Sequence, residues 1–178
     1  MPHHAIRILR TAAIIALAGA ALATTSTPAV AAPGDGPNQH LVDAYLAEHP
    51  GGVQTGPSDI SYSGGKFVVT VARPAASLAG ADCPSGWFCF YDKINFGYPR
   101  GRLSDCSWQD LGSWGWRNRT ESVAYNLGSG YVTFFDTDST YSALFAVGAS
   151  SSGKARSIAD VGGSRNRADE VYRTNCGP

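Results

Sequence analysis

Four cysteines constrain the fold of this chain more than any other feature of its sequence. Cys83, Cys89, Cys106 and Cys176 all lie after residue 82 of a chain of 178 residues. Four cysteines indicate either two disulfides or a metal site, and the compartment in which the protein folds decides between the two.

The N-terminus indicates export. Met1 to Arg10 contains two arginines and no acid, an alanine-rich apolar run follows to Ala23, and Ala29-Val30-Ala31 matches a small-residue cleavage site. This order of segments is typical of a secretory signal peptide, and the apolar run is short for a membrane span. We therefore expect residues 1–31 to be a signal peptide, the protein to be secreted and extracellular, and its cysteines to be oxidised.

Sequence distance suggests how the cysteines pair. Cys83 and Cys89 are close enough to pair locally, which leaves Cys106 to pair with Cys176. In the chain-entropy model the short loop stabilises the fold by ~2 kcal/mol and the long loop by ~4 kcal/mol. Zinc is the alternative, but the chain has no C-x-x-C spacing and both histidines of the mature chain precede the cysteines.

The charge balance argues against a polyanionic partner. The chain has 14 Lys and Arg against 14 Asp and Glu, and loss of the signal peptide removes Arg7 and Arg10 but no acid. The mature chain is therefore nearly neutral and has no run of like charge. We expect neither nucleic acid nor a membrane as its partner, and we expect a monomer.

Residues 32–82 contain neither cysteine nor tryptophan and predict a helix followed by a β-hairpin. The helix is expected from a capping Asn38 to His49, with its apolar residues between 41 and 46 on one face. Strands at 59–62 and 66–72 then flank a Gly64-Gly65 turn. A linker of small residues follows, so an alternative interpretation is that 32–82 is a pro-segment removed by cleavage before Cys83.

Residues 83–178 predict an all-β domain with an internal repeat. Arg117 to Val123 resembles Arg165 to Val171, and each half runs from an aromatic strand to an Arg-Asn-Arg turn. Each unit of four strands has one apolar face, so we expect the two units to pair as a β-sandwich. The expected strands are 87–91, 102–104, 122–126, 131–135, 142–146 and 171–174, with a helical turn near 109–114.

The start of this domain resembles a known family. Cys83-Pro84-Ser85-Gly86-Trp87-Phe88-Cys89-Phe90-Tyr91, followed by Asn95-Phe96-Gly97, resembles the opening of the secreted actinobacterial metalloproteinase-inhibitor family, which has a βγ-crystallin-like fold. Tyr91 and Phe96 also fit the spacing of the crystallin signature, although Tyr98 stands where that signature has Gly.

This resemblance implies both a fold and a function. The fold would be a βγ-crystallin-like, two-motif Greek-key β-sandwich over 83–178, preceded by the small helix and hairpin. The protein would bind secreted metalloproteases and block them through a rigid surface loop. Inhibitors of the family carry a second close cysteine pair at the contact loop, whereas the second half of this domain has only Cys176, so no contact loop is assigned.

The Arg-Asn-Arg stretches are also candidate calcium sites, because some βγ-crystallins bind Ca²⁺ through similarly placed stretches. The resemblance implies as candidate ligands Asn118, Glu121, Asn166 and Asp169. Two arginines in each stretch oppose a cation, so the favoured interpretation is a set of surface ion pairs. These would join Arg117, Arg119, Arg165 and Arg167 to Glu121, Asp169 or Glu170. We expect no cofactor, with Ca²⁺ as the alternative.

The four tryptophans suggest a different binding function. All lie between Trp87 and Trp116, and exposed tryptophans can stack on sugar rings, so a cell-wall or glycan-binding module is the alternative to an inhibitor. Core packing is the commoner role of such residues. In Trp114-Gly115-Trp116, strand alternation predicts one ring facing inward and the other outward.

Nothing in the sequence indicates catalysis. The cysteine-bearing domain has no histidine for a serine or cysteine nucleophile, and the chain has no H-E-x-x-H, G-x-S-x-G or phosphate-loop motif. Asp136 and Asp138 alternate within a turn and are interpreted as a solvated loop. We therefore expect a non-catalytic protein whose partner is a secreted protease.

Overall fold

The computed structural model describes residues 36–76, 80–138 and 141–176, so the expected signal peptide lies outside the described residues. The described chain is mostly β, with two antiparallel sheets and one short α-helix, which confirms the predicted all-β sandwich class. Its elements are α1 (Gln39–Glu48), β1 (Val53–Gln54), β2 (Asp59–Tyr62), η1 (Ser63–Gly65), β3 (Phe67–Thr70), β4 (Phe88–Lys93), β5 (Gly97–Leu103), β6 (Ser107–Asp110), η2 (Leu111–Trp114), β7 (Ser122–Tyr125), β8 (Tyr131–Asp136), β9 (Ser142–Gly148), η3 (Ser150–Ser152), β10 (Ser157–Ile158), η4 (Gly162–Ser164) and β11 (Glu170–Thr174).

The helix and hairpin form where the sequence predicts them. α1 buries Val42 and Tyr45 on its apolar face. Asn38 occupies the N-cap position, but its side chain does not cap the helix; it donates a hydrogen bond to Ser58 Oγ at 2.9 Å. β2 and β3 pair in antiparallel register across η1, with Tyr62 opposite Phe67.

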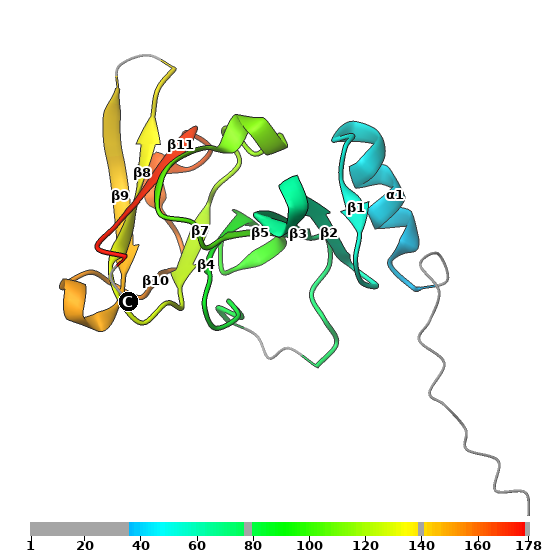
Figure 1. The fold of residues 1–178 in the computed structure, drawn as a ribbon, viewed down its shortest axis with the longest axis horizontal. Coiled ribbons are helices and arrows are strands. Elements are labelled where there is room, and N and C mark those ends of the chain that lie inside the picture. The colour runs from blue at the N-terminus through cyan, green and yellow to red at the C-terminus, as the bar shows by residue number, and fades with distance from the viewer. Residues whose placement is uncertain (1–35, 77–79, 139–140, 177–178) are drawn as a thin grey trace, which may run out of the picture. The chain divides into compact units, whose positions relative to one another are not determined.

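The hairpin extends the sheet of the cysteine-bearing segment. The first sheet has the order β1-β2-β3-β5-β4-β7-β10, so β3 lies between β2 and β5 (Figure 1). Val69 of β3 pairs with Gly101 of β5. The backbone of residues 67–70 therefore satisfies part of the hydrogen-bonding capacity of β5, whose own half of the repeat supplies only β4 as a neighbour.

Each half of the repeat contributes one strand to the sheet of the other half. The second sheet has the order β6-β11-β8-β9, of which Figure 1 labels β11, β8 and β9, and β6 comes from the first half. In return, β10 from the second half pairs with β7 in the first sheet. Neither sheet is complete without the other half of the chain.

Equivalent backbone hydrogen bonds link the two Arg-Asn-Arg turns. The Asn118 amide donates to Ala168 O at 3.0 Å, and the Asn166 amide donates to Thr120 O at 3.1 Å. Both asparagines adopt a left-handed backbone, with φ of 56° and 55°, which asparagine tolerates better than most residues. The repeat in the sequence is therefore a repeat in local structure.

One apolar core fills the space between the sheets and continues under α1. Aromatic rings from both halves and from the N-terminal segment meet in it: Phe67, Phe90 and Phe134 are fully buried. Phe90 packs edge-on against Phe134 at 6.1 Å and against Trp116 at 5.2 Å between ring centroids. No helix within the described residues is long and apolar enough to cross a membrane.

Candidate functional site

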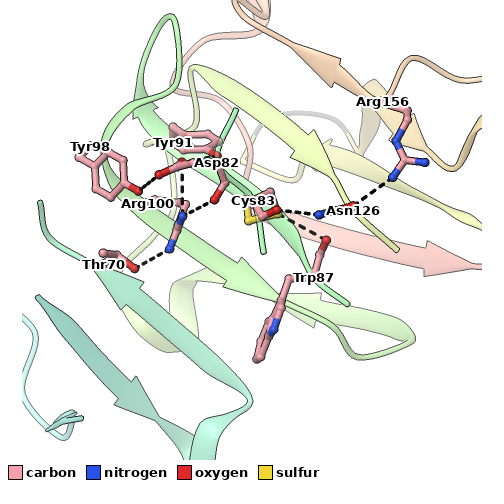
Figure 2. The surroundings of a disulfide bond; sticks show 10 residues. Thr70, Asp82, Cys83, Trp87, Tyr91, Tyr98, Arg100, Asn126 and Arg156 are labelled. Carbon is pink, nitrogen blue, oxygen red and sulfur yellow. Dashed lines mark hydrogen bonds and ion pairs between the residues drawn. A yellow bond between two sulfur atoms is a disulfide. The ribbon is translucent and has the colours of Figure 1, made fainter. Parts of the chain in front are cut away.

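A half-buried carboxylate organises the segment that leads into β4. The Tyr91 hydroxyl donates to Asp82 Oδ1 at 3.1 Å, and the Tyr98 hydroxyl donates to Asp82 Oδ2 (Figure 2). The guanidinium groups of Arg100 and Arg73 lie 3.3 Å and 3.5 Å from the same carboxylate. Four side chains from β4, β5 and the linker therefore converge on one acid.

The electrostatics of this cluster favour the charged form of Asp82. Burial opposes ionisation, but the hydrogen bond from Tyr98 and the charge of Arg100 outweigh burial, so the pKa of Asp82 is lowered below its ordinary 3.8. Burial, with the nearby Asp82, raises the pKa of Tyr91 and of Tyr98. At neutral pH both hydroxyls therefore keep the protons that they donate to the carboxylate.

Arg100 connects this carboxylate to the N-terminal hairpin. It is 4 % exposed. Its Nη1 donates to the Asp82 backbone oxygen at 2.6 Å, and its Nη2 donates to Thr70 Oγ1 in β3 at 2.9 Å (Figure 2). Because a buried guanidinium is costly without counter-charge, the three residues act as one unit.

The first disulfide fixes an exposed loop beside the cluster. Cys83 and Cys89 are joined with an S–S distance of 2.04 Å. Asn126 Nδ2 donates to Cys83 O at 2.8 Å (Figure 2). The Gly86 amide donates to Asn126 O at 2.9 Å. Residues 84–87 are therefore held at both ends while Ser85 and Gly86 stay exposed.

A hollow next to this loop is too small for a typical ligand. It has a volume of about 240 Å³ and is lined in part by Cys83, Asn126 and Arg156. Small-molecule sites usually measure about 300–1,000 Å³. This hollow is therefore smaller than the usual site of a small molecule.

The second disulfide joins residues far apart in the sequence. Cys106, between β5 and β6, is bonded to Cys176, just after β11, and 70 residues separate them. The two disulfides account for all four cysteines, and no free cysteine remains among the described residues. The chain that leaves β11 is thus tied to the edge strand β6.

A second polar cluster links α1 to the β-sheets through Arg119. Its Nε lies 3.0 Å from Asp92 Oδ1, its Nη1 lies 3.2 Å from His49 Nε2, and its guanidinium stacks on Trp116 at 4.6 Å from the ring centroid. Nη1 also approaches the Tyr45 hydroxyl at 3.4 Å. Burial, and then the charge of Arg119, lower the pKa of His49 below its ordinary 6.5.

The four candidate calcium ligands make hydrogen bonds to other protein groups. Asn166 Nδ2 donates to Glu121 Oε1 at 3.0 Å, and Asn118 Nδ2 donates to Asp138 Oδ2 at 2.9 Å. Asp169 Oδ2 accepts from the Thr137 amide at 2.8 Å. Within the described residues, no group of three or more His, Cys, Asp or Glu side chains could hold a metal ion.

The arginines of the repeat form ion pairs, but not with the partners that the sequence suggested. Each pairs with an aspartate instead of Glu121, Asp169 or Glu170. The observed pairs are Arg117 with Asp110, Arg119 with Asp92, Arg165 with Asp160, and Arg167 with Asp136. The predicted partners are wrong because the glutamates and Asp169 face other strands, where they accept hydrogen bonds or lie on the outer sheet face.

The exposure of the tryptophans differs from the predicted pair of one inward and one outward ring at Trp114 and Trp116. Trp116 is fully buried, and Trp114 is half-buried, stacks on Phe67 at 4.9 Å and donates to Ser63 Oγ at 3.1 Å. The exposed one is Trp108, at 48 %. The sequence did not indicate that Trp108 is the exposed tryptophan. It did not reveal the Asp82 and Arg119 clusters either, because their members are separated by many residues and share no motif.

A comparison with protein families indicates what kind of protein carries these polar clusters and loops. Residues 76–147 match the model of peptidase inhibitor family I36. This I36 region contains Asp82, the first disulfide loop and the strands β4 to β8. The match supports a peptidase inhibitor family and a non-catalytic role, as expected from the missing catalytic residues. No curated protein and no solved structure matches this chain.

The I36 region does not include all strands of the two sheets. The match ends in β9 and begins after β3, so the N-terminal hairpin, β10 and β11 lie outside it. Two disulfide bonds and a peptidase inhibitor family fit an extracellular protein.

Proposed function

We propose that this protein is a secreted inhibitor of metalloproteases that blocks its target with a rigid surface loop. The observation that carries this proposal is the I36 match over a region braced by the Cys83–Cys89 disulfide and the Asp82 cluster. The metalloprotease class rests on the resemblance of the Cys83 to Tyr91 opening to metalloproteinase inhibitors.

The physical requirement for such an inhibitor is a loop that loses little entropy on binding. Ordering a flexible interface costs about 0.5–1.5 kcal/mol for each immobilised side chain. Here the exposed loops connect strands whose ends are fixed by disulfides and buried polar groups. A protease binds its substrate as an extended, mobile segment in the active-site cleft. A rigid loop that resists unfolding would occupy the cleft without adopting that conformation.

The N-terminal segment supports the same proposal as part of the mature inhibitor. Arg100 bonds to Thr70, and β3 pairs with β5, so residues 36–73 complete the sheet that carries the first disulfide. We therefore infer that the secreted form retains this segment after the signal peptide is removed. Mass spectrometry of the secreted protein tests this, because a mature N-terminus near Cys83 would contradict it.

The test of function is an activity titration. The purified mature protein, with both disulfides intact, is titrated against a thermolysin-like metalloprotease and, in parallel, against a subtilisin-like serine protease. We expect loss of metalloprotease activity at micromolar inhibitor and no effect on the serine protease. Unchanged activity of both enzymes would refute the inhibitor role, and inhibition of the serine protease alone would refute the metalloprotease class.

Prolonged incubation identifies the contact loop. An inhibitor that enters the active site is cleaved slowly, if at all, at one bond of the loop that occupies the cleft. We expect mass spectrometry to find at most a single cut within one exposed loop. Rapid cleavage at many positions would show that the protein is a substrate. The matched control is the variant with Cys83→Ala and Cys89→Ala, which we expect to be cleaved faster.

A further inference from the structure

The outer face of the second sheet carries a cluster of aromatic rings. Trp108 of β6 lies 4.7 Å from Tyr172 of β11, 4.9 Å from Phe135 of β8 and 5.7 Å from Tyr141 before β9, measured between ring centroids. Trp108 is 48 % exposed and Tyr141 is 59 % exposed. We call these four residues, together with Glu170, the aromatic–acidic face.

The core does not need these rings. Along β11, Val171 and Arg173 are buried whereas Glu170, Tyr172 and Thr174 alternate to the other side. A sheet face directed at water normally carries polar side chains. Four neighbouring aromatic side chains there, two of them exposed, are the kind of surface that marks an interaction site.

A carboxylate without a cation lies within this face. Glu170 pairs in register with Phe135 on one neighbouring strand and with Asp110 on the other. The Asp110 carboxylate forms an ion pair with Arg117, with Nη2 and Oδ1 3.1 Å apart. No hydrogen bond or ion pair joins the half-buried Glu170 carboxylate to any other described residue. Two acids directly opposite on adjacent strands repel each other, so this position favours an incoming positive charge.

The combination of rings and carboxylate selects a particular chemistry. A guanidinium or ammonium group is attracted to the face of an aromatic ring, most strongly to tryptophan. Arginine in addition stacks flat on such a ring and donates paired hydrogen bonds to a carboxylate. A neutral sugar would stack on the rings but would leave the charge of Glu170 unbalanced.

We propose that the aromatic–acidic face binds an arginine or lysine side chain presented by a partner protein, with the cation stacked on Trp108 and paired with Glu170. The rings of Tyr172, Phe135 and Tyr141 surround this contact. The inference holds for any protein partner and does not depend on inhibition of a peptidase, so the two proposals fail separately.

The experiment uses the mature, ¹⁵N-labelled protein and N-acetyl-arginine amide as the probe. We expect a saturable shift of the Trp108 indole N–H signal and of backbone amides in β6 and β11, weakening as salt is added. N-acetyl-glutamine amide, which lacks the charge, and an N-acetylglucosamine oligomer serve as comparison probes. We expect neither to produce the same shifts.

Two variants separate the contributions of charge and ring. Glu170→Gln keeps the shape of the side chain and should weaken arginine binding about fivefold, whereas Trp108→Ala, which has no indole signal at this position, should abolish the saturable shifts of the backbone amides in β6 and β11. Glu48→Gln is the matched control, because the Glu48 side chain is 78 % exposed on α1 and lies outside this face. It should bind as the unmodified protein does.

Several results would overturn the proposal. Equal responses to the arginine and glutamine probes would show that charge is not recognised. Unchanged affinity in Glu170→Gln would remove the carboxylate from the site. Shifts elsewhere in the protein would place the site on another surface. A response of the Trp108 signal to the sugar oligomer and not to arginine would assign the face to glycan binding instead.

Discussion

Replacing Phe67 by alanine tests whether the N-terminal segment folds as one unit with the I36 region. Phe67 is fully buried. Its ring stacks on Trp114 at 4.9 Å and contacts Phe90 and Trp116, each at 6.0 Å between centroids. Three of its aromatic neighbours thus come from the part of the chain after residue 83, so truncation opens a cavity between the two segments.

The expected cost is large compared with the stability of a small domain. Truncating a buried phenylalanine to alanine loses the transfer free energy of the ring and leaves a cavity. The two effects together destabilise the fold by about 3–5 kcal/mol. Domains of this size are stable by about 5–15 kcal/mol in total. Phe67→Ala should therefore strongly lower the urea concentration at the midpoint of unfolding. Unfolding is measured by tryptophan fluorescence with both disulfides intact, and we expect a single transition.

The control is a hydrophobic truncation at the surface of the same segment. Val53 is 66 % exposed, so Val53→Ala should change stability by no more than about 0.5 kcal/mol. A loss below about 1 kcal/mol for Phe67→Ala would refute the packing argument, since the typical cost at a buried site is about 3–5 kcal/mol. A separate early transition would show that residues 36–73 unfold independently.

Three further perturbations have defined outcomes in the same unfolding assay. Asp82→Asn leaves a buried guanidinium without counter-charge and should cost about 3 kcal/mol at neutral pH. Because the folded pKa of Asp82 is lowered, its stabilisation is fully present above the ordinary 3.8 and is lost as the pH falls through the folded pKa, so the variant should lose this acid dependence. Joint replacement of Cys106 and Cys176 by alanine should cost about 4 kcal/mol. The lowered pKa of His49 makes the protein lose stability as the pH falls below 6.5 towards the folded pKa, and His49→Gln should flatten this part of the stability curve.

Each of these outcomes can fail in a distinct way. An unchanged acid limb in Asp82→Asn would mean that other carboxylates control acid unfolding. A cost below about 2 kcal/mol for the Cys106–Cys176 replacement would place it no higher than the chain-entropy value of the short loop. A slope that persists in His49→Gln would exclude His49 as the source of the pH dependence.

Local periodicity was sufficient to predict α1, the hairpin and most of the strands. It failed at β1, β6 and β10, which are short edge strands without a clear alternation of apolar residues. It also placed the start of β5 too late, because Gly97, Pro99 and Gly101 interrupt the pattern. Gly101 is required by packing: a Cβ there would lie 2.3 Å from the ring of Phe90. The sequence of β5 alone cannot reveal that constraint.

The polar clusters could not be predicted for a related reason. Arg119 meets Asp92 across 27 residues, and Arg167 meets Asp136 across 31. By contrast, Arg165 and Asp160 are only five residues apart. A search limited to neighbours in the turn therefore assigned Glu121, Asp169 or Glu170 as partners, and it missed the aspartates of β4 and β8 that pair with Arg119 and Arg167. Cysteine pairing escaped this difficulty because four cysteines allow only three arrangements.

The exchange of β6 and β10 between the two halves has a consequence for where function can lie. Since each sheet needs a strand from the other half, and the two turns bond reciprocally, a substitution inside this framework disturbs both halves at once. Loops and outer sheet faces are exempt from that coupling. Binding residues can therefore be substituted with least disturbance on these surfaces, which include the outer sheet face of Trp108 and Glu170 and the surface loops proposed for inhibition.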